Sequence, residues 1–165
     1  MNIIFLDVDG VLNSEAYFEE NKNKGYLAIS DYHLQMLAKI YHTCNANIVL
    51  SSSWRILDDK DVKSEIYQCL LDELARYDMK IVSKTSVIDM NRPLEIKTWL
   101  DSYNRWNQDT IHFVSLDDDF SKEDYDKYGI GDCLIKTCFY CNKVSEGGLQ
   151  PGHVAKAIEI LNGEE

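Results

Sequence analysis

A run of four apolar residues, Ile3 to Leu6, leads directly into two carboxylates and a glycine near the start of the chain. A continuous apolar run is typical of a strand that is buried on both faces, as in a parallel sheet. Side chains two apart on a strand point to the same side. We therefore expect Asp7 and Asp9 to lie together at the carboxyl end of the strand, where open α/β sheets bind ligands. The alternative is a simple turn, for which Asp-x-Asp-Gly is also a common sequence.

The net charge limits the partners of the chain. Its 165 residues include 17 basic and 28 acidic ones, which gives a net charge of −11. The length favours a single domain spanning 1–165. A protein this acidic is not a general polyanion binder, because phosphate contacts need Lys and Arg. A phosphorylated substrate must therefore be held by a local basic cluster or by a bound cation.

Cysteine usage and hydropathy point to a reducing compartment. The five cysteines form an odd set, and the N-terminus lacks the basic region of a signal peptide. No stretch approaches the roughly 18 apolar residues of a membrane span. We therefore expect a cytoplasmic protein with free thiols and no membrane partner.

Apolar runs and helical periodicity alternate along the chain. Further strands are predicted at 48–50, 80–82, 111–116 and 133–136. Helices are predicted to begin at Ser30 or Asp31, at Asp58 or Asp59, at Arg92-Pro93, at Lys122 and after Gly152. The apolar stripe of the second helix, which is expected to face the core, consists of Ile66, Leu70, Leu71 and Leu74. The polar segment from Ser14 to about Ile29 is interpreted as a short insertion. This alternation favours an α/β fold with a mainly parallel sheet.

Polar groups follow three of the predicted strands, and parallel strands end at one edge of a sheet. They are the pairs Asp7/Asp9, Ser51/Ser52 and Asp117/Asp118. Clustered carboxylates favour a hard cation, and Mg²⁺ commonly joins one or two of them to a phosphate. Arg92 or Lys97 supplies positive charge near the start of a helix. This set of groups is typical of phosphoryl transfer.

Four motifs resemble those of the haloacid dehalogenase (HAD) superfamily, in the same order. They are Asp7-Val-Asp-Gly-Val, Ser51 after an apolar strand, a basic residue before the acidic strand, and Leu116-Asp-Asp118. The resemblance implies a HAD-like, Rossmannoid three-layer sandwich with a minimal cap insertion. A closer likeness is to the HAD domains of Swiss Army Knife RNA repair proteins. It is carried by Leu6-Asp-Val-Asp-Gly-Val-Leu-Asn13, Ser51-Ser-Ser-Trp-Arg55, Arg92-Pro-Leu-Glu-Ile-Lys-Thr-Trp-Leu100, Leu116-Asp-Asp-Asp119 and Gly148-Leu149.

The resemblance also implies roles for individual residues. Asp7 is the expected nucleophile, which forms an aspartyl-phosphate, and Asp9 protonates the leaving oxygen and then activates water. The expected ligands of Mg²⁺ are Asp7, the backbone carbonyl of Asp9, and Asp117 or Asp118.

The remaining assignments carry alternatives. Ser51 is expected to bind the transferred phosphoryl group, with Ser52 as the register alternative, and the basic residue is Arg92 or Lys97. Arg55 either receives substrate phosphate or pairs with an acid such as Asp58 beside a packed Trp54. Asn13 either orients the loop after the first motif or caps the next segment. Asp119 is either a third ligand or a charge flanking a helix, and the second interpretation is favoured.

These expectations describe a Mg²⁺-dependent phosphohydrolase, and three functions stay open. The short insertion leaves an open site that admits a bulky phosphorylated nucleic-acid end, as in RNA repair. The net charge of −11 keeps small phosphomonoesters as the alternative substrates. A non-catalytic phospho-receiver or regulatory binding module is the alternative from another class. A receiver retains an acyl-phosphate, whereas a phosphatase releases phosphate repeatedly.

Overall fold

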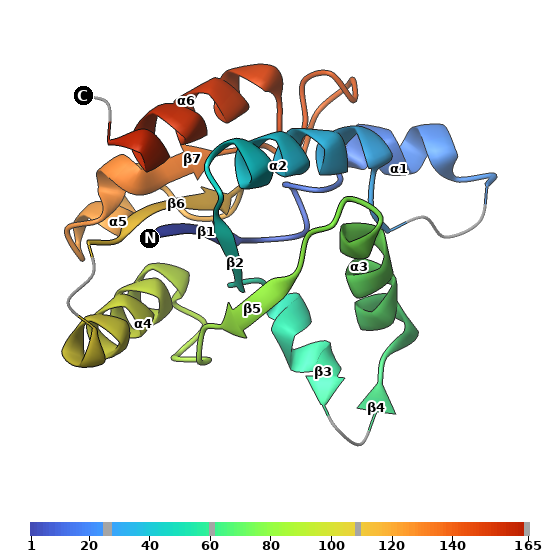
Figure 1. Ribbon diagram of the computed structural model, residues 1–165. Coiled ribbons are helices and arrows are strands. Elements are labelled where there is room, and N and C mark those ends of the chain that lie inside the picture. The colour runs from blue at the N-terminus through green and yellow to red at the C-terminus, as the bar shows by residue number, and fades with distance from the viewer. Residues whose placement is uncertain (25–27, 60–61, 108–109, 164–165) are drawn as a thin grey trace.

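A five-stranded parallel sheet forms the centre of the computed structural model, with the strand order β5-β2-β1-β6-β7 (Figure 1). The structure describes residues 1–24, 28–59, 62–107 and 110–163, and of residues 58, 59, 62 and 63 the backbone alone. The strands of this sheet are β1 (Asn2–Leu6), β2 (Asn47–Leu50), β5 (Ile81–Lys84), β6 (His112–Asp117) and β7 (Leu134–Lys136). A separate antiparallel pair consists of β3 (Asp58–Asp59) and β4 (Val62–Lys63).

Helices alternate with the strands of the sheet along the chain. They are α1 (Glu15–Asn21), α2 (Asp31–Thr43), α3 (Glu65–Ala75), α4 (Arg92–Trp106), α5 (Lys122–Asp126) and α6 (Pro151–Asn162), with short 3₁₀ helices η1 (Ser53–Leu57) and η2 (Gly131–Cys133). In the described part of the chain, no helix combines the length and the apolar character needed to cross a membrane.

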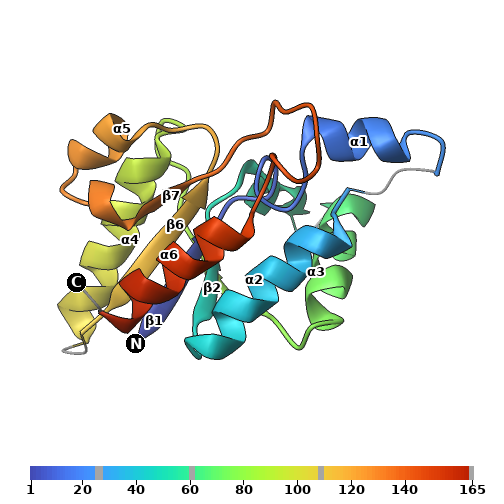
Figure 2. The ribbon, with the colours of Figure 1, turned by 90° about the horizontal axis from the view of Figure 1, so that it is seen from above.

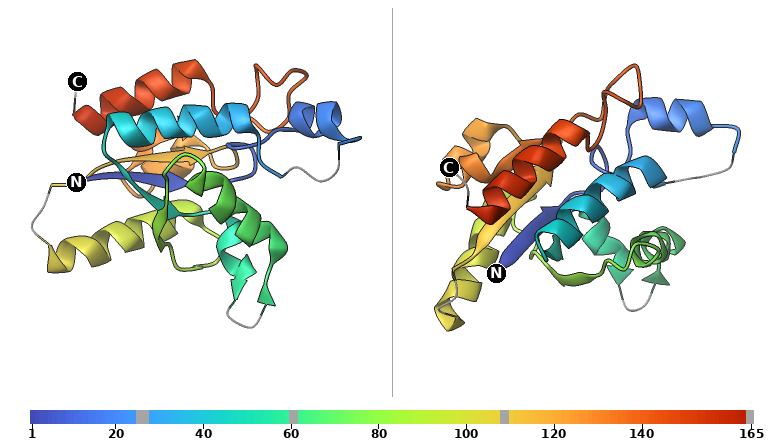
Figure 3. Two further views of the ribbon diagram at one scale, coloured as in Figure 1. Left: turned by 45° about the vertical axis from the view of Figure 1, so that its right-hand side comes forward. Right: turned by 45° about the horizontal axis from the view of Figure 1, so that its top comes forward.

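Strand β1 separates two hydrophobic clusters, because its side chains alternate between the faces of the sheet. Ile4 and Leu6 join the larger cluster, which takes in residues of α2, α3 and α6. Ile3 and Phe5 join the smaller one, with residues of α4 and α5. Helices α2 and α6 thus cover one face of the sheet, and α4 lies on the other (Figures 2 and 3). This three-layer α/β arrangement confirms the predicted fold.

The register of the sheet brings the polar strand ends together. Leu6 of β1 is aligned with Leu50 of β2 on one side and with Leu116 of β6 on the other. Two backbone hydrogen bonds continue this register beyond the strand, from Asp7 N to Leu116 O and from Ser51 N to Leu6 O. The residues that follow the three leucines therefore emerge at one edge, as the sequence pattern predicts.

The prediction that the second helix begins at Asp58 or Asp59 is wrong. Those residues form β3, and α3 begins at Glu65, after Ser64, whose side chain accepts a hydrogen bond from the amide of Tyr67. Ile66, expected inside, is 37% exposed, and Tyr67 is buried in its place. Ser64 is the stronger N-cap, because its side chain satisfies an otherwise unpaired amide in the first turn.

The insertion after β1 contains a helix that the sequence pattern did not indicate. The hydroxyl of Ser14 caps α1 by accepting a hydrogen bond from the amide of Tyr17, and Ala16 is buried. A seven-residue helix with one buried apolar position gives no clear hydrophobic periodicity. Its capping residue, Ser14, is the sequence signal that indicates such a helix.

Candidate active site

Asp7 lies at the end of β1 and is almost completely buried. Its carboxylate accepts hydrogen bonds from the backbone amide of Val8, at 2.8 Å, and from the side chain of Ser52. Burial raises the pKa of Asp7 to about 7, and the charge of Asp117 adds to this shift, while Arg92 and the Ser52 hydrogen bond oppose it. Asp7 is thus a carboxylate whose charged form requires neighbouring positive charge.

Arg92 supplies that charge from the first turn of α4. Its Nη1 atom lies 2.6 Å from Oδ2 of Asp7 and 2.7 Å from Oδ1 of Asp117, and its Nε donates to the carbonyl of Ser51. The guanidinium also lies over the ring of Phe120. Burial lowers the pKa of Arg92, but the two carboxylates outweigh this and raise it above its usual range, so the side chain is always charged.

The acidic pair that follows β6 divides into one engaged and one open carboxylate. Asp117 forms an ion pair with Arg92. It also accepts hydrogen bonds from the amides of Asp119 and Phe120 and from the hydroxyl of Tyr125. Within the described chain, the side chain of Asp118 accepts no hydrogen bond, and burial together with the charges of Asp119 and Asp117 raises its pKa to about 6. Asp117 therefore holds the arrangement in place, whereas Asp118 is open to a ligand.

Asp9 is held by two neutral donors. The side-chain amide of Asn13 donates to Oδ1 of Asp9, and the indole nitrogen of Trp54 donates to Oδ2. Asn13 is fully buried, and it also accepts from the amide of Gly10 and donates to the carbonyl of Ala28. Asn13 thus shapes the loop after β1 and does not line the pocket, in accord with the loop-orienting alternative.

The two serines after β2 are both fully buried, but their hydroxyls differ. Ser52 hydrogen-bonds to Asp7, whereas the Oγ atom of Ser51 has no partner among the described residues. The carbonyl of Ser51 accepts from both Arg92 and Arg55. The segment therefore serves the site through its backbone as well as through its hydroxyls.

Arg55 lies in a second buried ion pair, 2.7 Å from Glu95 of α4, and its Nη1 also donates to the carbonyl of Ser52. Its acidic partner among the described side chains is Glu95, whereas the side chain of Asp58, the acid suggested by the sequence, lies outside the described residues. Glu95 is fully buried and accepts a hydrogen bond from the amide of Ile88 as well. Arg55 therefore ties the end of β2 to α4 and is engaged by protein groups.

Lys97 lies outside this cluster, on the exposed side of α4, where it pairs with Asp101. Arg92 and Lys97 are five positions apart, which turns their side chains to different faces of a helix. Of the two basic candidates, the structure brings only Arg92 to the carboxylates.

A pocket of about 440 Å³ opens above these groups. Polar residues line one part of it, namely Asp7, Asp9, Ser53, Arg92, Asp118 and Asp119. Aromatic residues line another part, namely Phe18, Phe139 and Tyr140. Sequence reasoning missed the aromatic part, because these residues are distant in the chain and follow no periodic pattern.

Comparison with known families identifies the type of domain. The family described as "HAD domain in Swiss Army Knife RNA repair proteins" matches residues 3–140. The chain belongs to this family. No curated protein and no solved structure matches the chain. The match ends at Tyr140, so it includes both acidic strand ends, Arg92 and the aromatic part of the pocket.

Membership in the HAD family indicates a hydrolase of the phosphatase type that acts on a phosphorylated substrate. HAD domains generally use Mg²⁺, and the donor set of this one fits such an ion. Carboxylate oxygens of Asp7, Asp117 and Asp118 all lie within 4.8 Å of one another. Oxygen ligands suit Mg²⁺ better than softer metals, and the raised pKa values of Asp7 and Asp118 indicate two carboxylates that lack sufficient positive charge.

Proposed function

We propose that this HAD domain is a Mg²⁺-dependent phosphomonoester hydrolase that acts through an aspartyl-phosphate on Asp7. The observation that carries the proposal is the position of Arg92, whose Nη1 atom contacts both Asp7 and Asp117 at the edge of an open pocket. A buried carboxylate beside a fixed guanidinium and an open second carboxylate is suited to displacement at phosphorus.

The residues divide the chemistry between two steps. In the first, a carboxylate oxygen of Asp7 bonds to phosphorus while the bond to the leaving oxygen breaks, and Asp9 gives that oxygen a proton. In the second, Asp9 takes a proton from a water molecule, which attacks the phosphorus of the aspartyl-phosphate and releases Asp7 and inorganic phosphate. The hydrogen bonds from Asn13 and Trp54 orient Asp9 for both transfers.

Arg92 balances the anionic charge at the centre in both steps, because its guanidinium is already held in place by the Ser51 carbonyl and Asp117. Mg²⁺ would be held by Asp7, Asp118, the carbonyl of Asp9 and, less directly, Asp117. When bound, Mg²⁺ supplies Lewis-acid polarisation of the phosphoryl oxygens. Ser52 orients Asp7 through its hydrogen bond, and Ser51 offers a hydroxyl that is otherwise unused.

For the substrate, we propose the phosphorylated end of a nucleic acid. Two features support this: the family occurs in RNA repair proteins, and the described insertion beside the pocket holds a single short helix, α1. The acidic character of the chain limits affinity for a long backbone but does not prevent recognition of one end.

The test is a phosphate-release panel on the purified full chain, run with Mg²⁺ and with EDTA. The panel contains 3′- and 5′-phosphorylated oligonucleotides, nucleotides and sugar phosphates. We expect Mg²⁺-dependent turnover that Asp7→Asn abolishes. Preference for sugar phosphates would redirect the substrate assignment to small molecules, and turnover that survives EDTA or Asp7→Asn would overturn the mechanism.

A further inference from the structure

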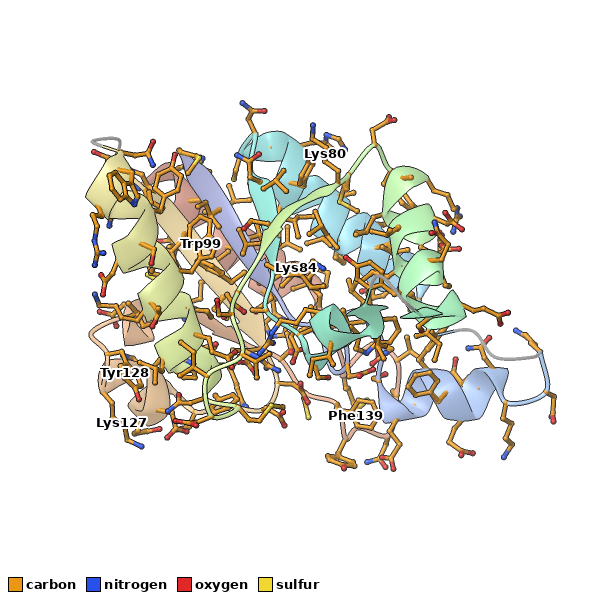
Figure 4. All side chains as sticks on the ribbon, turned by 90° about the horizontal axis from the view of Figure 1, so that it is seen from below. Lys80, Lys84, Trp99, Lys127, Tyr128 and Phe139 are labelled. Atoms are coloured by element: carbon orange, nitrogen blue, oxygen red, sulfur yellow. The ribbon has the colours of Figure 1, made fainter. Side chains whose placement is uncertain are left out.

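The aromatic part of the pocket is built by two segments that are far apart in the chain. Phe18 comes from α1, and Phe139 and Tyr140 come from the loop after β7, which lies beside α1 (Figures 2 and 4). The ring centroids of Phe18 and Phe139 are 6.2 Å apart, and those of Phe139 and Tyr140 are 5.1 Å apart. We call these three residues the aromatic wall.

Backbone hydrogen bonds hold the aromatic wall in a fixed place relative to the carboxylates. The amide of Thr137 donates to the carbonyl of Asp117, and the amide of Glu15 donates to the carbonyl of Phe139. The amide of Gly148 donates to the carbonyl of Cys138. The loop is therefore anchored to the strand end that carries Asp117 and to the start of α1. A surface that is held in this way is organised before a ligand arrives.

The exposure of the wall differs from that of a core cluster. Tyr140 is 77% exposed although it lines the same pocket as the buried Asp7. Phe18 and Phe139 are partly buried, and the rings of Phe139 and Tyr140 meet edge-on. An exposed aromatic ring at the edge of a pocket offers a flat face to a ligand, and stacking of nucleic-acid bases uses such faces.

The charges of the pocket restrict the chemistry of the group that meets the wall. Asp9, Asp118 and Asp119 line the pocket with Asp7, and Arg92 is the one basic residue among its described lining residues. Arg92 already contacts Asp7 and Asp117. Further negative charge inside the pocket, close to these carboxylates, would be repelled, whereas a neutral planar group meets an aromatic surface. The volume of about 440 Å³ is within the range of small-ligand pockets.

We propose that the aromatic wall is a nucleobase platform: the base next to the reacting phosphate stacks on Tyr140, with Phe139 and Phe18 as the rest of the wall. This rests on the proposed function and specifies its substrate as a nucleoside whose terminal phosphate lies over Asp7. A nucleoside suits a pocket that is lined by both charged and aromatic residues, because the ribose joins a charged end to a planar end.

Binding to the Asp7→Asn variant, which we expect not to turn over, tests the platform separately from the catalytic mechanism. Calorimetry compares adenosine 3′- and 5′-monophosphate with ribose 5-phosphate, which lacks the base. We expect the nucleotides to bind more tightly, and Tyr140→Ala to reduce that advantage by about 10-fold, the size of one stacking contact. Tyr140→Trp should restore it, because any flat aromatic ring serves.

Trp106→Ala is the matched control, since Trp106 is 83% exposed but lies at the opposite end of α4 from Arg92. It should leave the nucleotide advantage unchanged. Phe139→Leu keeps an apolar side chain and should reduce the advantage as well, if folding is intact by circular dichroism. Equal binding of nucleotides and ribose 5-phosphate, or the same loss in Trp106→Ala as in Tyr140→Ala, would overturn the platform.

Two further binding measurements identify the kind of molecule that carries the base. Tighter binding of a phosphorylated single-stranded tetranucleotide than of the mononucleotides assigns the platform to nucleic-acid ends, and equal binding assigns it to free nucleotides. Phenyl phosphate places a ring directly on the phosphate, and a loss on Tyr140→Ala as large as for the nucleotides would overturn the nucleoside assignment. Absence of phosphate release by the wild-type chain would count against the proposed function alone.

Discussion

A Cβ atom on Gly10 would overlap Cγ of Asp118. Gly10 also has a φ of +71°, in the left-handed region that favours glycine. The loop after β1 and the acidic end of β6 are therefore in direct contact. Only a residue without a side chain leaves room for the open carboxylate.

Gly10→Ala should displace Asp118 and weaken Mg²⁺ binding at least about 10-fold, the loss typical of disturbing groups that orient a metal site. Calorimetric titration with Mg²⁺ measures this. Gly129→Ala is the matched control, because Gly129 has the same φ of +71° and nothing within 4 Å of its Cβ position. If both variants lost the same affinity, the contact with Asp118 would not be the cause.

Arg92→Ala should lower kcat by about 100-fold or more, the usual effect of removing a group that stabilises charge in a transition state. It should also destabilise the fold, since it leaves two buried carboxylates without their cation. Lys97→Ala, on the same helix, should retain wild-type kcat, because Lys97 pairs with Asp101 at the surface, away from the carboxylates. Steady-state kinetics of both variants decides between the two basic candidates, and the reverse ranking would refute this assignment.

Asp7→Asn should increase stability in metal-free buffer. Burial raises the pKa of Asp7 to about 7 from 3.8, so the folded chain binds this proton more tightly than the unfolded chain does. The contribution of Asp7 to stability therefore falls as the pH rises from about 4 to about 7 and is constant above that range. The advantage of the Asn variant should be largest near pH 8 and should shrink towards pH 5.5.

Thermal unfolding in EDTA across this pH range measures the effect. Addition of Mg²⁺ should raise the Tm of the wild type but not that of Asp7→Asn, because ligands stabilise only a state that binds them. A variant that is less stable than the wild type at pH 8 without metal would contradict the prediction.

Glu95→Gln should lower the free energy of unfolding by about 3 kcal/mol or more, because it leaves the buried guanidinium of Arg55 without a counter-charge. The double variant Arg55→Met/Glu95→Gln should recover part of the loss, which urea denaturation can measure. Asp31→Asn, in the exposed pair with Arg76, is the control and should have a much smaller effect. Strict additivity of the Arg55 and Glu95 changes would show that the pair is not coupled.

Most of the sheet and its polar edge was predictable from the sequence, because both depend on short local signals. The apolar run before Asp7 and the similar run before Asp117 identify buried strands, and parallel strands place their ends together. The sequence predicts the start of α3 wrongly, because Ser64 is a competing cap whose side chain satisfies a backbone amide of the first turn.

The details of the site depend on long-range packing, which sequence patterns do not contain. Arg92 and Lys97 have similar charge, and only the orientation of α4 distinguishes them. The pairing of Arg55 with Glu95 was also not predicted, although Arg92 and Glu95 are three positions apart and thus share a helix face. The contact between Phe18 and Phe139 joins segments with no common pattern.

The register of β1 between β2 and β6 has a consequence for folding. Leu6 is aligned with Leu50 and with Leu116, so the central strand pairs with segments far along the chain. Such non-local pairing forms slowly, and its loop-closure entropy must be overcome before the contacts form. The carboxylates and Arg92 are then brought together only after this pairing. During refolding, enzymatic activity should therefore return with the last phase that completes the sheet, later than the recovery of helical circular dichroism.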